Sequence, residues 1–210
     1  MSEPLKTRRE KEKQARYDAI LDAAELVFSE KGYERTSMDD TAALSRALLY
    51  VYFKDKAAIQ RGIMLRAGHS LCRRFEEARQ TADTGLAQIS AMGVAYYNFY
   101  REQPDYFSAL TTASTAMAEA DDELAGEMFG CKAETMELMV GAIHLGLEDG
   151  TMNRDRIHDP VETALYLRGA LHGVIMLCQS EMTESGLENN FSAESLIRHT
   201  MEMLTSSISS

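Results

Sequence analysis

Residues that interrupt helices are scarce in this sequence, and this scarcity constrains its fold more than any other feature. The 210 residues include only 3 prolines and 13 glycines, and long stretches contain neither. A sheet of many strands would need frequent turn residues, whereas apolar residues here recur at the 3.6-residue spacing of amphipathic helices. The sequence therefore predicts an all-α fold. We expect the main helices over residues 16–31, 46–53, 56–80, 85–102, 104–117, 120–149, 160–183 and 192–206.

The bulk composition is that of a globular chain in a reducing compartment. Hydrophobic residues make up 45% and charged residues 26% of the sequence, which is typical of folded domains. Three scattered cysteines without a CxxC spacing favour neither disulfides nor a zinc site. The N-terminus lacks the apolar core of a signal peptide. The most apolar run, Ala164 to Cys178, is shorter than the roughly 18 residues of a membrane span. We therefore expect a cytoplasmic protein with no membrane partner.

Charge is distributed unevenly along the chain. The net charge is −11, yet residues 1–70 hold 13 Lys/Arg and 11 Asp/Glu, whereas residues 71–210 hold 9 and 22. A weakly basic head on an acidic body suits a protein that contacts phosphate groups with one end only. Solubility alone also accounts for an acidic body, so the asymmetry suggests nucleic acid as a partner without establishing it.

The first 55 residues contain the start and stop signals of closely spaced helices. Gly32 ends the first helix at the usual C-terminal position. Thr36 and Ser37 are each followed three residues later by an aspartate, Asp39 and Asp40. This is a capping-box arrangement, and it predicts that a short second helix begins here.

A third helix follows this short segment after a tight connection. Ser45 is placed to cap it, and Asp55 is placed to cap the long fourth helix. A second and third helix joined in this way form a helix-turn-helix unit, whose recognition helix enters the major groove of B-DNA. We therefore expect a three-helix DNA-binding domain over residues 1–55, with residues 1–13 as a flexible basic arm. A larger helical bundle would follow over residues 56–210.

Four short motifs occur in order within this head. They read ILDAA at residues 20–24, VFSEKGY at 27–33, TSMDD at 36–40 and LYVYFKDK at 49–56. Together they closely resemble the TetR family of bacterial transcriptional regulators over residues 16 to about 66. The remaining residues are similar to that family only in length and helical layout.

The resemblance implies DNA-binding roles on both sides of the turn. The residues concerned are Thr36, Ser37, Ser45, Arg46, Ala47, Tyr50, Tyr52 and Lys56. The first two would cap the second helix and contact the DNA backbone, and the next three would open the recognition helix. The tyrosine hydroxyls and the lysine would lie near phosphates, while Phe28, Leu49 and Phe53 would form the core. For the tyrosines, simple packing of a three-helix domain is the alternative.

The head departs from the family pattern within the turn. Between the Asp39–Asp40 pair and the Leu49–Tyr50 pair it is shorter by about three residues, nearly one helical turn. Ala43 stands where the family usually has a glycine. The second helix would then be little more than one turn long, or a single helix would run from Ser37 to Phe53. Either outcome would affect how the recognition helix is presented to DNA.

The resemblance implies that the body dimerises and binds a small molecule. Residues 161–178 are apolar almost all round, and a helix without a polar face needs cover on both sides. A second subunit would supply that cover, although a central helix buried in a monomer is the alternative. The interface residues that we predict are Leu165, Gly169, Gly173, Met176, Ile197 and Met201.

Aromatic and methionine side chains concentrate between residues 92 and 139. Flexible thioethers and amphipathic rings suit an adaptable apolar pocket. The predicted ligand-binding residues are Tyr96, Tyr100, Phe107, Met117, Met136, Met139, His144 and His172. The two histidines would be polar anchors. Core packing explains most of these residues equally well.

Motifs for catalysis, for metal binding and for a phosphate loop are missing from the sequence. No glutamate is followed three residues later by a histidine, as a di-iron bundle requires, and HExxH does not occur. We therefore expect no enzyme, no cofactor and no metal. Among the cysteines, Cys72 beside Arg73 and Arg74 is the best redox candidate, although a buried inert thiol is the simpler interpretation.

These observations favour a ligand-responsive transcriptional regulator. We expect a repressor that binds a palindromic double-stranded DNA operator as a homodimer and responds to a small-molecule effector. The alternative is a TetR-like dimer that binds a ligand or a protein and whose DNA binding is impaired, because its helix-turn-helix is about three residues short, nearly one turn.

Overall fold

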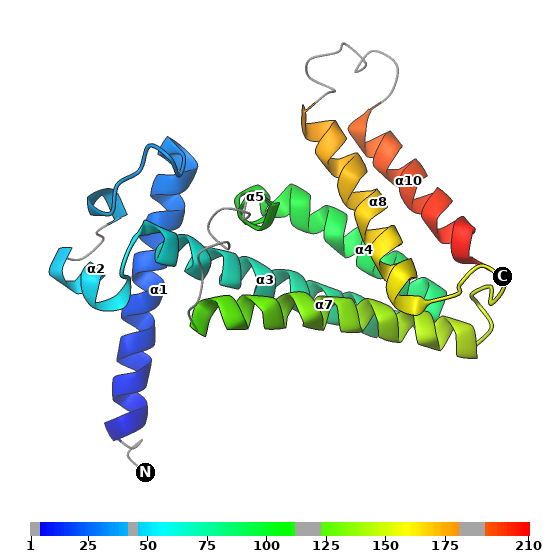
Figure 1. Cartoon of the computed structure of the whole chain (residues 1–210), viewed down its shortest axis with the longest axis horizontal. Helices are drawn as coiled ribbons and strands as arrows, with labels where there is room; N and C mark the ends of the chain where they lie inside the picture. The colour runs from blue at the N-terminus through cyan, green and yellow to red at the C-terminus, as the bar shows by residue number, and fades with distance from the viewer. Residues whose placement is uncertain (1–4, 42–45, 112–122, 181–191) are drawn as a thin grey trace. The chain divides into compact units, whose positions relative to one another are not determined.

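The computed structural model describes residues 5–41, 46–111, 123–180 and 192–210. Its elements in chain order are α1 (Leu5–Lys31), η1 (Asp39–Thr41), α2 (Arg46–Tyr52), α3 (Lys56–Gln80), α4 (Gly85–Glu102), α5 (Pro104–Thr111), α7 (Glu123–Glu148), α8 (Pro160–Ser180) and α10 (Ala193–Ile208). The predicted all-α fold class is confirmed (Figure 1). Met117 and Ser45 lie outside the described residues.

The first helix is longer than its apolar periodicity predicts. α1 begins at Leu5, so residues 5–13 are helical where the sequence suggests a flexible arm. Lysine, arginine, glutamate and glutamine are strong helix formers. Arg8 Nε also lies 3.0 Å from Glu12 Oε1, one helical turn away. Because these residues are polar on every side, a search for apolar spacing gives no signal for this part of the helix.

Packing divides the chain into two compact units. The first unit comprises Met1–Gly68 and Pro104–Phe129, and the second comprises His69–Gln103 and Gly130–Ser210. This division differs from the boundary predicted at residue 55. The reason is that α3 runs without a break from Lys56 to Gln80, and its first turns belong to the core of the head.

The core of the first unit forms where α1, α2 and α3 meet. Its buried residues are Ile20, Leu21, Ala24, Leu49, Phe53, Ala58, Ile59 and Ile63. The rings of Tyr17 and Phe53 stack with centroids 4.9 Å apart. A Cβ atom at Gly62 would lie 2.9 Å from the Tyr17 hydroxyl and 3.0 Å from a Leu21 methyl carbon. α3 therefore approaches α1 closely at this position, and an alanine here would require the Tyr17 and Leu21 side chains to shift.

The core of the second unit joins α3, α4, α7, α8 and α10. Its central residues include Phe75, Met92, Ile143 and Leu167. A Cβ atom at Gly85 would overlap backbone atoms of α7, so the start of α4 packs directly against that backbone. The segment after α7 binds the C-terminus through a hydrogen bond from Asn153 N to Ile208 O of 2.9 Å.

Helix α8 lies beside α10 in the second unit (Figure 1). It carries apolar side chains on two of its faces. One face is buried and includes Ala164, Leu171 and Ile175. The other leaves Leu165 and Leu177 exposed at 54% and 46%. By length and mean hydropathy (1.2), Pro160–Gln179 also suits a membrane span. Its buried face nevertheless packs into the unit, as a core helix of a globular protein does.

Candidate nucleic-acid interface

Helix α2 has a buried face that fixes it and an exposed face that is available for contacts. Leu49 and Phe53, both 1% exposed, anchor it in the core of the first unit. Arg46, Ala47 and Tyr50 are exposed. A short helix held along one face in this way presents the opposite face outward, as recognition of a DNA groove requires.

Residues 32–41, which follow α1, form a tight, hydrogen-bonded turn. Gly32 ends α1 with a positive φ of 79°. Ser37 N donates to Asp40 Oδ2 over 2.9 Å, and Asp40 N donates to Ser37 Oγ over 3.3 Å. The capping box predicted between these two residues is confirmed. The Thr36 hydroxyl instead points inward and donates to Gly32 O over 2.9 Å.

Within the described residues, the element that follows this capping box is the 3₁₀ turn Asp39–Thr41, and α2 begins at Arg46. Because residues 42–45 lie outside the described residues, the predicted length of the second helix stays a prediction. The Lys31 ammonium lies 2.8 Å from Asp40. Hydrogen bonds from Lys31 and Ser37 hold the pKa of the Asp40 carboxyl well below its usual range.

Lys56, predicted to pair with a phosphate, contacts the protein backbone. Its ammonium donates to Tyr33 O over 2.8 Å and to Thr36 O over 2.9 Å. It also lies 4.2 Å from the centre of the Tyr33 ring. Two of its three protons therefore hold the loop after α1. At the same helix start, Ala58 N donates to Asp55 Oδ1 over 2.8 Å, so the predicted cap is confirmed.

Apart from Lys56, the predicted DNA-binding residues that the structure describes divide into an exposed set and a buried or partly buried set. Arg46, Ala47 and Tyr50 share the exposed face of α2, and Ser37 is exposed in the turn. Thr36 is buried, and Tyr52 packs partly against the core. Sequence reasoning missed Val51, which is 77% exposed. Its position four residues after Ala47 places both on one side of α2, a signal that helical spacing alone provides.

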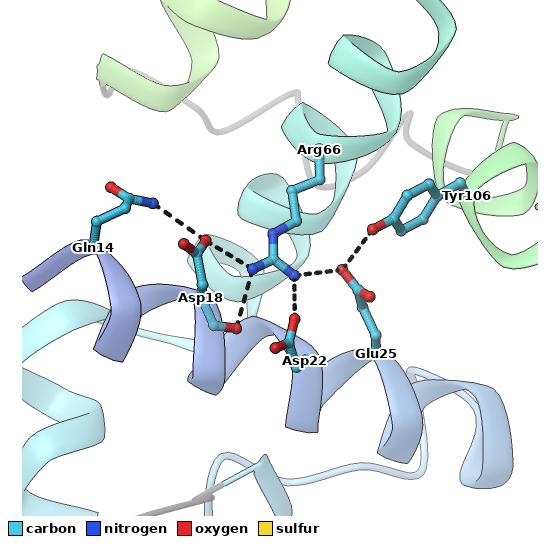
Figure 2. A network of polar contacts seen from close by, with 6 residues as sticks. All are labelled: Gln14, Asp18, Asp22, Glu25, Arg66 and Tyr106. Atoms are coloured by element: carbon cyan, nitrogen blue, oxygen red, sulfur yellow. Dashed lines mark hydrogen bonds and ion pairs between the residues drawn. The ribbon is translucent and has the colours of Figure 1, made fainter. Parts of the chain in front are cut away.

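A second residue that the sequence analysis missed is Arg66 of α3, at the centre of a polar cluster (Figure 2). Its guanidinium lies 2.8 Å from Asp18, 2.8 Å from Asp22 and 3.0 Å from Glu25, all on α1. The Tyr106 hydroxyl of α5 donates to Glu25 over 3.2 Å. We call these five residues the Arg66 cluster. It connects three helices of the first unit.

Electrostatics reinforce the Arg66 cluster. Partial burial by itself lowers the pKa of Arg66, but its hydrogen bonds to Asp18, Asp22 and Glu25 outweigh burial and raise that pKa. Burial, followed by the negative charge of Glu25, raises the pKa of Tyr106. Both groups therefore keep their protons, and the guanidinium stays a permanent cation facing three acidic side chains.

The predicted ligand-binding residues do not all lie together. Tyr96, Met136 and Met139 belong to one apolar cluster in the second unit. The Tyr96 hydroxyl lies 2.8 Å from His172 Nδ1. His144 is exposed on α7, and Phe107 is buried in the first unit. Tyr100 is half-buried beside the Tyr97 ring.

The Tyr96–His172 pair is a polar contact inside a largely apolar bundle. Burial raises the pKa of Tyr96 to about 12. Burial also lowers the pKa of His172, and the positive charge of Arg168 adds to this effect. The tyrosine hydroxyl and a neutral imidazole are therefore the forms present near neutral pH.

The residues predicted for a dimer interface also divide by exposure. Leu165, Gly169 and Gly173 lie on the exposed face of α8, whereas Met176 is half-buried. Ile197 of α10 is 1% exposed, so it packs inside the unit. Met201 is half-buried next to Gly93 of α4.

The cysteine proposed for redox chemistry lies in an unfavourable environment for a thiolate. Cys72 is buried, and desolvation together with Glu134 raises the pKa of its thiol to about 12. A reactive cysteine needs the opposite shift. These observations favour the inert thiol over the redox candidate.

The fold and the exposed face of α2 define the class of protein, an all-helical helix-turn-helix protein with a larger helical body. Residues 20–61 match the profile of the bacterial regulatory proteins of the tetR family. The resemblance seen in the motifs of the head is thereby confirmed for these residues. None of the curated protein sequences matches the chain.

Solved structures share the fold across nearly the whole chain. PfmR of Thermus thermophilus, a TetR family transcriptional regulator, is 23% identical with a TM-score of 0.67, covering 89% of this chain and 97% of that one. FadR of Bacillus subtilis, solved with stearoyl-CoA, is 17% identical with a TM-score of 0.68, covering 91% and 99%. AibR, solved with isovaleryl coenzyme A and operator DNA, is 18% identical with a TM-score of 0.65, covering 90% and 98%.

Proposed function

We propose that this protein is a cytoplasmic, ligand-responsive repressor that binds a palindromic operator as a homodimer. The observation that supports this most directly is the exposed surface of α2, where Arg46 and Tyr50 are accessible on a helix anchored by Leu49 and Phe53. A guanidinium suits the acceptors of a guanine edge or a phosphate, and a tyrosine hydroxyl suits a phosphate. The weakly basic head and the acidic body are consistent with DNA contact at one end.

Selection from fragmented genomic DNA, followed by a salt titration, tests DNA binding. We expect enrichment of one palindromic sequence and an affinity that falls steeply as salt rises, because phosphate contacts release counterions. Arg46→Ala should weaken binding to the selected site, while Arg73→Ala, at an exposed arginine of the second unit, serves as a charge-matched control. Weak binding without sequence preference would instead support the alternative, a dimer that binds a ligand or protein and has lost its operator.

The repressor role needs a separate measurement. A reporter gene placed downstream of the selected operator should be silenced by the wild-type protein and released by Arg46→Ala. Activation of the reporter by the wild-type protein would contradict repression, although it would leave DNA binding intact.

The homodimer is supported by the exposed apolar face of α8. Leu165, Gly169, Gly173 and Leu177 recur every four residues along it. Exposed apolar surface of this kind marks protein interfaces, and glycines allow two helices to approach closely. Sedimentation should give twice the chain mass of 23.5 kDa. Leu165→Glu should shift the mass to one chain, whereas Val94→Glu, at an exposed valine of α4, should not. A wild-type mass of one chain at micromolar concentration would refute the dimer.

The part of the effector that lies beside the Tyr96–His172 contact is expected to be largely apolar with one hydrogen-bonding group, as the acyl chain and thioester of an acyl-CoA are. The Tyr96–His172 contact supplies a polar anchor beside Met136 and Met139. Two proteins of the same fold were solved with coenzyme A thioesters. A thermal-shift panel of acyl-CoA thioesters of increasing chain length provides defined probes. Binding should raise the melting temperature of the wild type and less so that of Tyr96→Phe. Equal shifts for both proteins would exclude the tyrosine as an anchor.

A further inference from the structure

The exposed face of α2 consists of two chemically different rows. Arg46 and Tyr50, four residues apart, form a polar row. Ala47 and Val51, also four residues apart, form an apolar row beside it. Residues at this spacing are neighbours on a helix surface. The face directed towards the proposed DNA site therefore offers hydrogen-bonding groups along one line and methyl groups along the next.

Among the residues that the structure describes, none packs against Val51 closely enough to bury its apolar side chain. Its exposed fraction of 77% is the largest among the large apolar side chains of the described residues. Leu49 and Phe53 already anchor the helix from the opposite side. Valine is also a weaker helix former than alanine or a straight-chain residue, so local helix stability does not favour it here.

The major groove offers few apolar partners for such a side chain. Base edges there present hydrogen-bond donors and acceptors, except for the 5-methyl group of thymine. A valine placed against a donor or acceptor would remove water without replacing its hydrogen bond, which is unfavourable. Against a thymine methyl, the same valine buries apolar surface on both sides.

We propose that Val51 contacts the 5-methyl group of a thymine in each operator half-site and thereby specifies an A·T pair at one position. This inference rests on the proposed function, because it requires sequence-specific DNA binding through α2. It goes further by assigning one specificity contact to a residue and by naming the chemical group that this residue reads.

Replacing single thymines of the selected operator by deoxyuridine tests the proposal directly. Deoxyuridine removes the methyl group and leaves base pairing unchanged. Fluorescence anisotropy at fixed salt should show a loss of wild-type affinity of about fourfold at one position in each half-site, the factor associated with burial of one methyl group. For Val51→Ala, thymine and deoxyuridine at that position should bind with affinities closer than about twofold. Val94→Ala, an exposed valine in the other unit, should discriminate as the wild type does.

The possible outcomes separate this proposal from the proposed function. Failure to select any operator would overturn both. An operator whose thymines all tolerate deoxyuridine equally in wild type and Val51→Ala would overturn only the valine contact. Loss of affinity in Val51→Ala by the same factor for thymine and deoxyuridine would also overturn it, because the side chain would then contact a group other than the methyl. Circular dichroism of Val51→Ala checks that the head remains folded.

Discussion

Substitution of Arg66 by methionine tests whether the Arg66 cluster stabilises the head. Methionine keeps an unbranched apolar stem but removes the guanidinium, which contacts Asp18, Asp22 and Glu25 (Figure 2). The three acidic side chains of α1 would then face one another without their shared cation. Tyr106 would still donate to Glu25, so that carboxylate keeps one partner.

The expected magnitude follows from how exposed each partner is. The Asp22 side chain is 70% exposed, so its ion pair with Arg66 is worth only about 0–1 kcal/mol. The side chains of Arg66 and Glu25 are 22% and 25% exposed. Hydrogen bonds to charged groups at such partly buried sites contribute about 1.5–3 kcal/mol. Because solvent still reaches the cluster, we expect a total loss of about 2 kcal/mol, or about 4–8 °C in melting temperature for a chain of this size.

Thermal unfolding monitored by circular dichroism provides the assay, and hydrogen exchange of the α1 amides locates the change. The second measurement is needed because a chain of two units need not unfold in one step. Arg8→Met is the matched control, since Arg8 pairs with Glu12 on the same helix with side chains 72% and 52% exposed. It should lower the melting temperature by less than about 2 °C. An Arg66→Met effect no larger than that of Arg8→Met would refute this account.

Three further predictions address packing, charge and pH. Gly85→Ala should lower the melting temperature, because the alanine Cβ would overlap the backbone of α7. Gly141→Ala, at a position with open space around it, should leave the melting temperature unchanged. Equal effects of the two substitutions would contradict the close packing at Gly85. Asp39 lies 3.0 Å from Arg46 and competes with DNA for the guanidinium. Asp39→Asn should therefore raise DNA affinity several-fold at low salt. An unchanged affinity would count against this competition. Burial lowers the pKa of His172, so folding favours the neutral imidazole. The stability that this shift contributes is present above the ordinary histidine pKa of about 6.5 and is lost as pH falls. The melting temperature should therefore drop more between about pH 7.5 and 5.5 in the wild type than in His172→Gln, and parallel curves would argue against this role.

Local signals in the sequence predict most helix boundaries correctly. Gly32 and Asp55 act at the ends where the sequence places them, because their effects depend on residues only a few positions away. The start of α1 is the exception. There, helix formation depends on propensity and on pairs such as Arg8–Glu12 rather than on apolar spacing.

Side-chain partners distant in sequence were beyond the reach of such signals. Asp18, Asp22 and Glu25 form an acidic stripe on α1, which a helical projection reveals, yet nothing local indicates that Arg66 lies opposite. The resemblance implies a phosphate contact for Lys56, whereas its hydrogen bond to Tyr33 O follows only from the fold of the loop. In both cases the sequence identifies a charge correctly, and the tertiary structure decides its partner.

The shortened turn raises the question of what then fixes the recognition helix. In this head, the loop before α2 is held from one side by Lys56, which donates to Tyr33 O and Thr36 O. α2 itself is held by Leu49 and Phe53, whose burial depends on α1 and α3. The orientation of α2 therefore depends mainly on core packing and on the start of α3, and only weakly on the length of the preceding element. Loss of helical residues from that element is consequently compatible with an outward-facing Arg46.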